Sequence, residues 1–187
     1  DNDTKVQNAL GVTEADVEHV LTLMTIQEKM FAPLTVDVDT EVSDEEAAQK
    51  RIVYVYMSTA GTETDDDGNT IDLTDEEKAA KKQELQDILD AARESGDLKA
   101  AVDAANENRD ENSKLSASET TYGADSTTPA EEVRTAADAL KDGELAEIVD
   151  TDTGYYAVQM VSTFDEDATA NKKDSIVTER KNTLYQE

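Results

Sequence analysis

Tyrosines are the residues of this sequence whose types and spacing come closest to forming a site. Tyr54 and Tyr56 lie in one β-branched and aromatic run, and Tyr155 and Tyr156 lie in a second run far along the chain. Phenol rings pack against apolar groups while their hydroxyls form hydrogen bonds. If the two runs pair in one sheet, the rings form either ordinary cross-strand packing or an aromatic face that binds a ligand, and both interpretations stay open.

A single histidine and an acidic segment are the two features that could indicate metal binding, and neither is a complete site. His19 is the single histidine, and without a second ligand nearby it reads as an ordinary helical residue. Glu63, Asp65, Asp67 and Gly68 resemble the first half of a calcium-binding loop, but Thr74 stands where the final glutamate ligand belongs. A solvated acidic turn is favoured here over a cation site, and we expect neither a metal nor a cofactor.

The composition restricts the partners. Acidic residues number 45 against 17 basic ones, a formal net charge of -28, which repels phosphate backbones and argues against nucleic-acid binding. The sequence has no cysteine, so disulfides cannot stabilise the fold. No run reaches the ~20 apolar residues of a membrane span. The first residues lack signal-peptide features, and a lipid anchor upstream of residue 1 is left open.

The elements that must position the tyrosines follow from hydrophobic periodicity. Residues 51–58 are apolar on both faces, which predicts a central strand. Three amphipathic helices follow, and a short strand at 147–150 and a longer one at 155–162 then form a hairpin. The third helix is expected to start after an N-cap at Thr128, and residues 106–121 are expected to form a polar loop. The order strand, three helices, two strands predicts a small α+β domain.

Helical segments flank this domain. Residues 13–31 carry a broad apolar stripe that includes Val17, Leu21 and Met24, with Thr13 as N-cap. A stripe this wide needs a partner helix, a client or a second copy of the chain, so a homodimer is one open alternative. The helix expected from about residue 169 could cover it. We therefore predict an N-terminal helical segment at 1–50, the α+β domain at 51–165 and a C-terminal helix at 166–187 packing on the first segment.

Four landmarks in this order resemble the parvulin-type peptidyl-prolyl isomerases found in extracytoplasmic foldases of the PrsA and SurA kind. They are the strand opening at Arg51, the segments Ser95-Gly96-Asp97-Leu98 and Ala139-Leu140-Lys141-Asp142-Gly143-Glu144, and the segment Thr153-Gly154-Tyr155-Tyr156. The resemblance covers about two thirds of the chain. It implies a parvulin-like β-α-α-α-β-β domain inserted in a chaperone-like helical module.

The resemblance also implies where a site would lie. Active members carry histidines at the positions that match Tyr54 and Tyr156, so both family histidines are replaced here by tyrosine. An aromatic that helps to wall the family's proline pocket matches Val133. The residues expected to contact a client are Tyr56, Met57, Val133 and Met160.

The function that this resemblance implies is that of an extracytoplasmic chaperone or foldase, at the cell surface as a lipoprotein or secreted. It would bind unfolded or proline-containing polypeptide clients, and its rotamase activity would be weak or lost. Two alternatives stay open: an active peptidyl-prolyl isomerase with a tyrosine-substituted site, and a non-catalytic surface lipoprotein with a structural or adhesive role.

Overall fold

The computed structural model describes residues 11–61, 71 and 73–186, and these form two compact units. The sheet unit runs from Asp44 to Lys172, and the helical unit combines residues up to Ser43 with those from Lys173 onward. The sheet unit thus extends beyond both ends of the expected 51–165 segment. None of the helices in the described part of the chain is long and apolar enough to cross a membrane.

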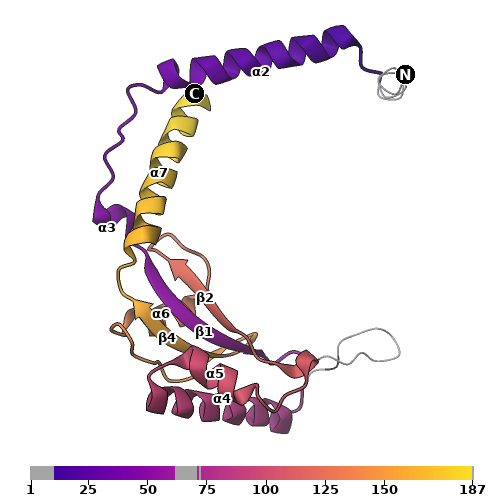
Figure 1. Cartoon of the computed structure of the whole chain (residues 1–187), viewed down its shortest axis with the longest axis vertical. Helices are drawn as coiled ribbons and strands as arrows, with labels where there is room; N and C mark the ends of the chain where they lie inside the picture. Colours follow the sequence, from indigo (N-terminus) through magenta and orange to yellow (C-terminus); the bar gives the residue numbers. More distant parts are fainter. Residues whose placement is uncertain (1–10, 62–70, 72, 187) are drawn as a thin grey trace. The chain divides into compact units, whose positions relative to one another are not determined.

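The sheet unit is built on one antiparallel sheet with the strand order β2-β1-β4-β3 (Figure 1). The strands are β1 (Lys50–Ser58), β2 (Ala117–Tyr122), β3 (Val149–Thr151) and β4 (Gly154–Ser162). β1 and β4 are the central pair, which explains why β1 is apolar on both faces. The predicted α+β class and the pairing of the two tyrosine-rich strands are confirmed.

Two helices, α4 (Asp75–Ser95) and α5 (Leu98–Ala105), cover one face of the sheet (Figure 1). α4 begins with a capping box in which the Thr74 hydroxyl and the Glu77 carboxylate each accept a hydrogen bond from the other residue's backbone N–H. It ends at Gly96, whose φ of 77° is the left-handed conformation that favours glycine. Beneath these helices lies a core that includes Val53, Val55, Leu85, Leu89, Leu98 and Val102.

The opposite face is covered by α6 (Glu131–Asp138), which packs on a second core formed with Ile52, Val158 and Met160. The predicted N-cap at Thr128 is wrong, because the helix starts two residues later with Ala130 as its N-cap. The first helical hydrogen bond runs from the Arg134 N–H to the Ala130 carbonyl, and the Arg134 side chain donates to the Pro129 carbonyl. Pro129 therefore precedes the helix.

β2 corrects the prediction of a loop at residues 106–121. Its sequence, Ala117-Ser118-Glu119-Thr120-Thr121-Tyr122, is too polar to indicate a buried strand. As an edge strand it pairs only with β1, from Lys50 opposite Tyr122 to Val55 opposite Ala117. Backbone pairing with a central strand supplied by another part of the sequence is a long-range property that local periodicity does not report.

The helical unit contains α2 (Glu14–Leu34) and most of α7 (Glu166–Gln186). Thr13 caps α2 as predicted, in a capping box with Asp16. α7 meets α2 near its C-terminal end, where the rings of Phe31 and Tyr185 have centroids 5.3 Å apart. No residue of α2 is buried, and Val17 and Leu21 are 44% and 57% exposed, so α7 leaves that part of the apolar stripe uncovered.

Candidate functional site

Three tyrosines form one aromatic cluster on the α6 face of the sheet, and we call Tyr54, Tyr56 and Tyr156 the tyrosine face. Tyr56 of β1 lies directly opposite Tyr156 of β4 in the antiparallel ladder. Their ring centroids are 4.7 Å apart, and those of Tyr54 and Tyr156 are 5.7 Å apart. Alternate residues of a strand share a face, so Tyr54 lies beside Tyr56.

The turn between β3 and β4 holds one end of this cluster. The Tyr56 hydroxyl donates a 2.7 Å hydrogen bond to the Thr153 carbonyl, which also accepts from the Thr59 N–H. Gly154 follows, and a Cβ atom there would lie 2.2 Å from the Met57 carbonyl oxygen and 2.7 Å from the Tyr56 ring. Only glycine allows the two strands and the ring to approach this closely.

The tyrosine face is accessible to solvent. Tyr56 is 38% exposed, whereas Tyr54 and Tyr156 are half-buried against the second core. Burial raises the pKa of Tyr156, and its neighbours Tyr56 and Tyr54 and the Glu132 carboxylate of α6 raise it further, against an opposing hydrogen bond with Thr153. Tyr156 is therefore a neutral phenol near pH 7, with a polar end and an apolar ring face.

The other residues expected at the site divide between the two faces of the sheet. Met57 is 6% exposed and belongs to the core on the α4 face, and Tyr155 lies on that same side with the Lys82 ammonium 5.2 Å from its ring centroid. Val133 of α6 and Met160 of β4 are fully buried in the second core, against which Tyr54 and Tyr156 pack, so neither can be reached by a client. The structure thus brings Tyr54, Tyr56 and Tyr156 together and separates Met57 and Tyr155 from them.

Ser118 extends the tyrosine face and was not found from the sequence. It pairs with Tyr54 across the β1–β2 ladder, so its side chain lies on the same side of the sheet. It is half-buried. The β-branched and aromatic run Thr120-Thr121-Tyr122 was the available signal, but three residues are too few to identify an edge strand on their own.

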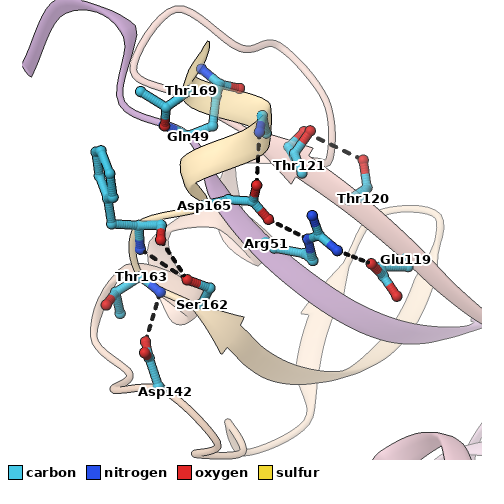
Figure 2. A network of polar contacts seen from close by, with 12 residues as sticks. Gln49, Arg51, Glu119, Thr120, Thr121, Asp142, Ser162, Thr163, Asp165 and Thr169 are labelled. Carbon is cyan, nitrogen blue, oxygen red and sulfur yellow. Dashed lines mark hydrogen bonds and ion pairs between the residues drawn. The ribbon is translucent and has the colours of Figure 1, made fainter. Parts of the chain in front are cut away.

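A polar network ties the start of β1 to the start of α7 (Figure 2). The Asp165 carboxylate accepts a hydrogen bond from the Ala168 N–H and forms an ion pair with Arg51, which also binds Glu119 of β2 at 3.0 Å. The Asp165 N–H donates to the Gln49 carbonyl, and the Gln49 N–H donates to the Thr169 hydroxyl. These contacts hold the strand that carries Tyr54 and Tyr56.

A separate hollow of about 240 Å³ also opens beside the start of β1, on the α6 side of the sheet. The Tyr122 hydroxyl and the Lys50 ammonium both donate to the same oxygen of Asp138, at 2.6 and 2.7 Å. Burial, together with the hydrogen bond to Asp138, raises the pKa of Tyr122. The contacts join β1, β2 and α6, and they leave the charges of Lys50 and Asp138 paired.

Residues considered for metal binding give no site in the described part of the chain. His19 is exposed on α2. The acidic run from Glu63 to Gly68 lies outside the described residues. Among the residues that the structure describes, no group of three or more histidine, cysteine or acidic side chains is arranged to hold a metal ion.

Comparison with protein families gives a match over more than half of the chain. The rotamase model, described as a PPIC-type PPIase domain, matches residues 63–162. That range includes β2, α6, β3 and β4 and ends at the last residue of β4. A search of curated proteins found no significant match.

Comparison with solved structures gives several PrsA proteins. The peptidylprolyl isomerase PrsA from Bacillus cereus is 13% identical, with a TM-score of 0.39 and coverage of 100% of this chain and 62% of that chain. The foldase protein PrsA from Lactococcus lactis is 19% identical, with a TM-score of 0.39 and coverages of 97% and 60%. That from Streptococcus pneumoniae is 19% identical, with a TM-score of 0.40 and coverages of 99% and 65%. The chain therefore spans less than two thirds of the length of these proteins.

Proposed function

Because the chain belongs to the PPIC-type peptidyl-prolyl isomerase family, we propose that it is a foldase-like protein that binds unfolded or proline-containing polypeptide segments at the tyrosine face. Its rotamase activity is weak or lost. The observation that carries the proposal is the clustering of Tyr54, Tyr56 and Tyr156, with ring centroids 4.7 and 5.7 Å apart, on an accessible face of the sheet.

Binding follows from the chemistry of aromatic surfaces. Aromatic-lined grooves dock proline-rich segments because the rigid proline ring packs on the flat rings and loses little conformational entropy. The tyrosine face offers three such rings, and Ser118 beside Tyr54 adds a hydroxyl that can bond to a peptide backbone. A protein segment without fixed structure would expose its prolines to this surface.

Weak catalysis follows from the size of the barrier and from the groups present. Rotation about an X-Pro bond faces a barrier of about 18–20 kcal/mol that arises from amide resonance. Catalysis requires groups that interact more strongly with the twisted amide than with the planar one. The resemblance assigns the family's two histidines to Tyr54 and Tyr156, which are phenols, and Tyr156 packs between Tyr54 and Tyr56.

A second candidate function is an active isomerase that uses these phenols. The position of Tyr156 in the aromatic cluster favours it, because the hydroxyl of a phenol can donate a hydrogen bond to the amide as it twists. The two candidates differ in rate alone, and both require binding at the tyrosine face.

Titration and exchange measurements on one short Ala-Pro peptide test the proposal. We expect chemical-shift changes confined to the residues around Tyr54, Tyr56 and Tyr156, and little or no increase in the cis–trans exchange rate by NMR. Tyr56→Ala should weaken binding about two- to tenfold, since an aromatic contact contributes roughly 0.5–1.5 kcal/mol. Tyr155→Phe, on the opposite face, is the matched control and should bind as the wild type does.

The outcomes separate the candidates. The second function would be established if the wild type accelerates cis–trans exchange of the peptide and the Tyr54→Phe and Tyr156→Phe variants bind the peptide without accelerating it. If millimolar peptide causes no chemical-shift changes in the protein, both candidate functions are overturned.

The location outside the cytoplasm, as a surface lipoprotein or a secreted protein, is part of the same proposal and rests on the resemblance to foldases. Cell fractionation of the host, followed by protease treatment of intact cells, tests it. Recovery of the protein only from the cytoplasm would contradict it. The chaperone role predicts that the protein delays aggregation of a reduced or heated client, as measured by light scattering.

A further inference from the structure

The tyrosine face has the chemistry to receive a positive charge as well as a proline ring. Ammonium and guanidinium groups are attracted to the faces of aromatic rings. The chain itself contains one such contact, between Lys82 and Tyr155 on the opposite side of the sheet, at 5.2 Å from the ring centroid. In the described part of the chain, no lysine or arginine lies over the rings of Tyr54, Tyr56 or Tyr156.

The charges around the face have the sign that a cation requires. Glu132 lies in the first turn of α6, which contacts β4 on the face of the sheet that carries Tyr156, and its charge contributes to the raised pKa of Tyr156. It is exposed, so its carboxylate can meet a ligand in solvent. The whole chain carries a net charge of -28, which raises the local concentration of cationic segments and repels anionic ones.

On the basis of the function proposed above, we propose that the tyrosine face selects polypeptide segments in which lysine or arginine adjoins the proline. The proline ring packs on one part of the aromatic cluster, and the neighbouring cation lies against a second ring within reach of the Glu132 carboxylate. A glutamate beside the proline is rejected by the same charges. A second copy of the chain is disfavoured as an occupant, because two such copies repel each other.

Three peptides that differ only in the residue before proline, namely lysine, leucine or glutamate, test this inference with the full chain. Affinities are measured by NMR titration at about 20 mM and 300 mM salt. We expect lysine to bind about two- to fivefold more tightly than leucine, the range typical of exposed cation–π contacts, and glutamate more weakly than leucine. The lysine preference should shrink at the higher salt concentration.

Glu132→Gln and Glu94→Gln separate the local effect from the net charge. Both remove one negative charge, but Glu94 lies exposed on α4, which covers the other face of the sheet. Only Glu132→Gln should reduce the lysine preference. Equal affinity of the wild type for all three peptides, or equal effects of the two variants, would overturn the inference and leave the proposed function standing. Failure of every peptide to bind would overturn the proposed function itself.

Discussion

Asp165 concentrates several structural roles in one buried side chain. It is only 6% exposed, its carboxylate accepts from the Ala168 N–H at the start of α7, and it pairs with Arg51 of β1 (Figure 2). Its backbone N–H donates to the Gln49 carbonyl at 2.7 Å. One residue thus links the end of β4, the start of α7 and the strand that carries two tyrosines of the tyrosine face.

Asp165→Asn should destabilise the sheet unit by about 2 kcal/mol, because it removes the charge partner of Arg51 and weakens the cap of α7. Urea unfolding monitored by the near-UV circular dichroism of the tyrosines measures this, since five of the six tyrosines lie in the sheet unit. Glu119→Gln removes the exposed partner of the same arginine and should cost much less. Equal losses for the two variants would contradict the assigned role of Asp165.

The stabilisation by Asp165 should depend on pH in a definite direction. The Ala168 N–H and then Arg51 hold the pKa of Asp165 below its ordinary value. As the pH falls, the Asp165 carboxylate is therefore protonated in the unfolded chain before it is protonated in the folded protein. Its contribution to the free energy of unfolding is present above about pH 4 and is lost below it. The stability difference between the wild type and Asp165→Asn should narrow from pH 7 to pH 3. A constant difference would show that the ionised carboxylate is not responsible.

At the scale of helices and strands, the buried side-chain amide of Gln159, a residue of β4, joins two turns to the sheet. Its oxygen accepts a hydrogen bond from the Leu98 N–H at 2.9 Å, and its nitrogen donates to the carbonyls of Gly96 and Gly143 at 2.8 and 3.2 Å. Gln159 is 8% exposed, so these bonds form away from solvent. The turn between α4 and α5 and the turn after α6 are thereby held to one strand.

Gln159→Met keeps the length of the side chain and removes all three hydrogen bonds. We expect a loss of about 2–4 kcal/mol, because the buried backbone groups of both turns are left without partners. The measurement is urea unfolding together with amide hydrogen exchange, in which the Leu98 N–H should lose protection. Gln83→Met, at an exposed position of α4, is the control and should be nearly neutral.

On the scale of the whole molecule, the excess of acidic residues determines how electrostatics affect stability. With 45 acidic and 17 basic residues, repulsion among carboxylates outweighs the attraction of the surface ion pairs. Salt should therefore stabilise the protein, and most of the rise in Tm should occur below about 0.2 M, where the screening length falls to about 8 Å. Thermal unfolding in a series of sodium chloride concentrations measures it. A Tm that falls over this range would mean that the ion pairs outweigh the repulsion.

Local sequence determined the elements that depend on neighbouring residues. The capping boxes at Thr13 and Thr74, the helix end at Gly96 and the central strand with two apolar faces all follow from short patterns, because capping and periodicity act within a few residues. The resemblance to the isomerase family also rested on such short segments, and the family match confirms it.

Only the tertiary structure decided which residues share the site. Tyr155 and Tyr156 are adjacent in the sequence, and the register of β4 against β1 sends Tyr156 to the tyrosine face and Tyr155 to the α4 core. A slip of one residue would exchange them, because side chains alternate between the faces of a sheet. The edge strand that adds Ser118 depends likewise on pairing with β1 over a long sequence separation, and no local pattern encodes that distance.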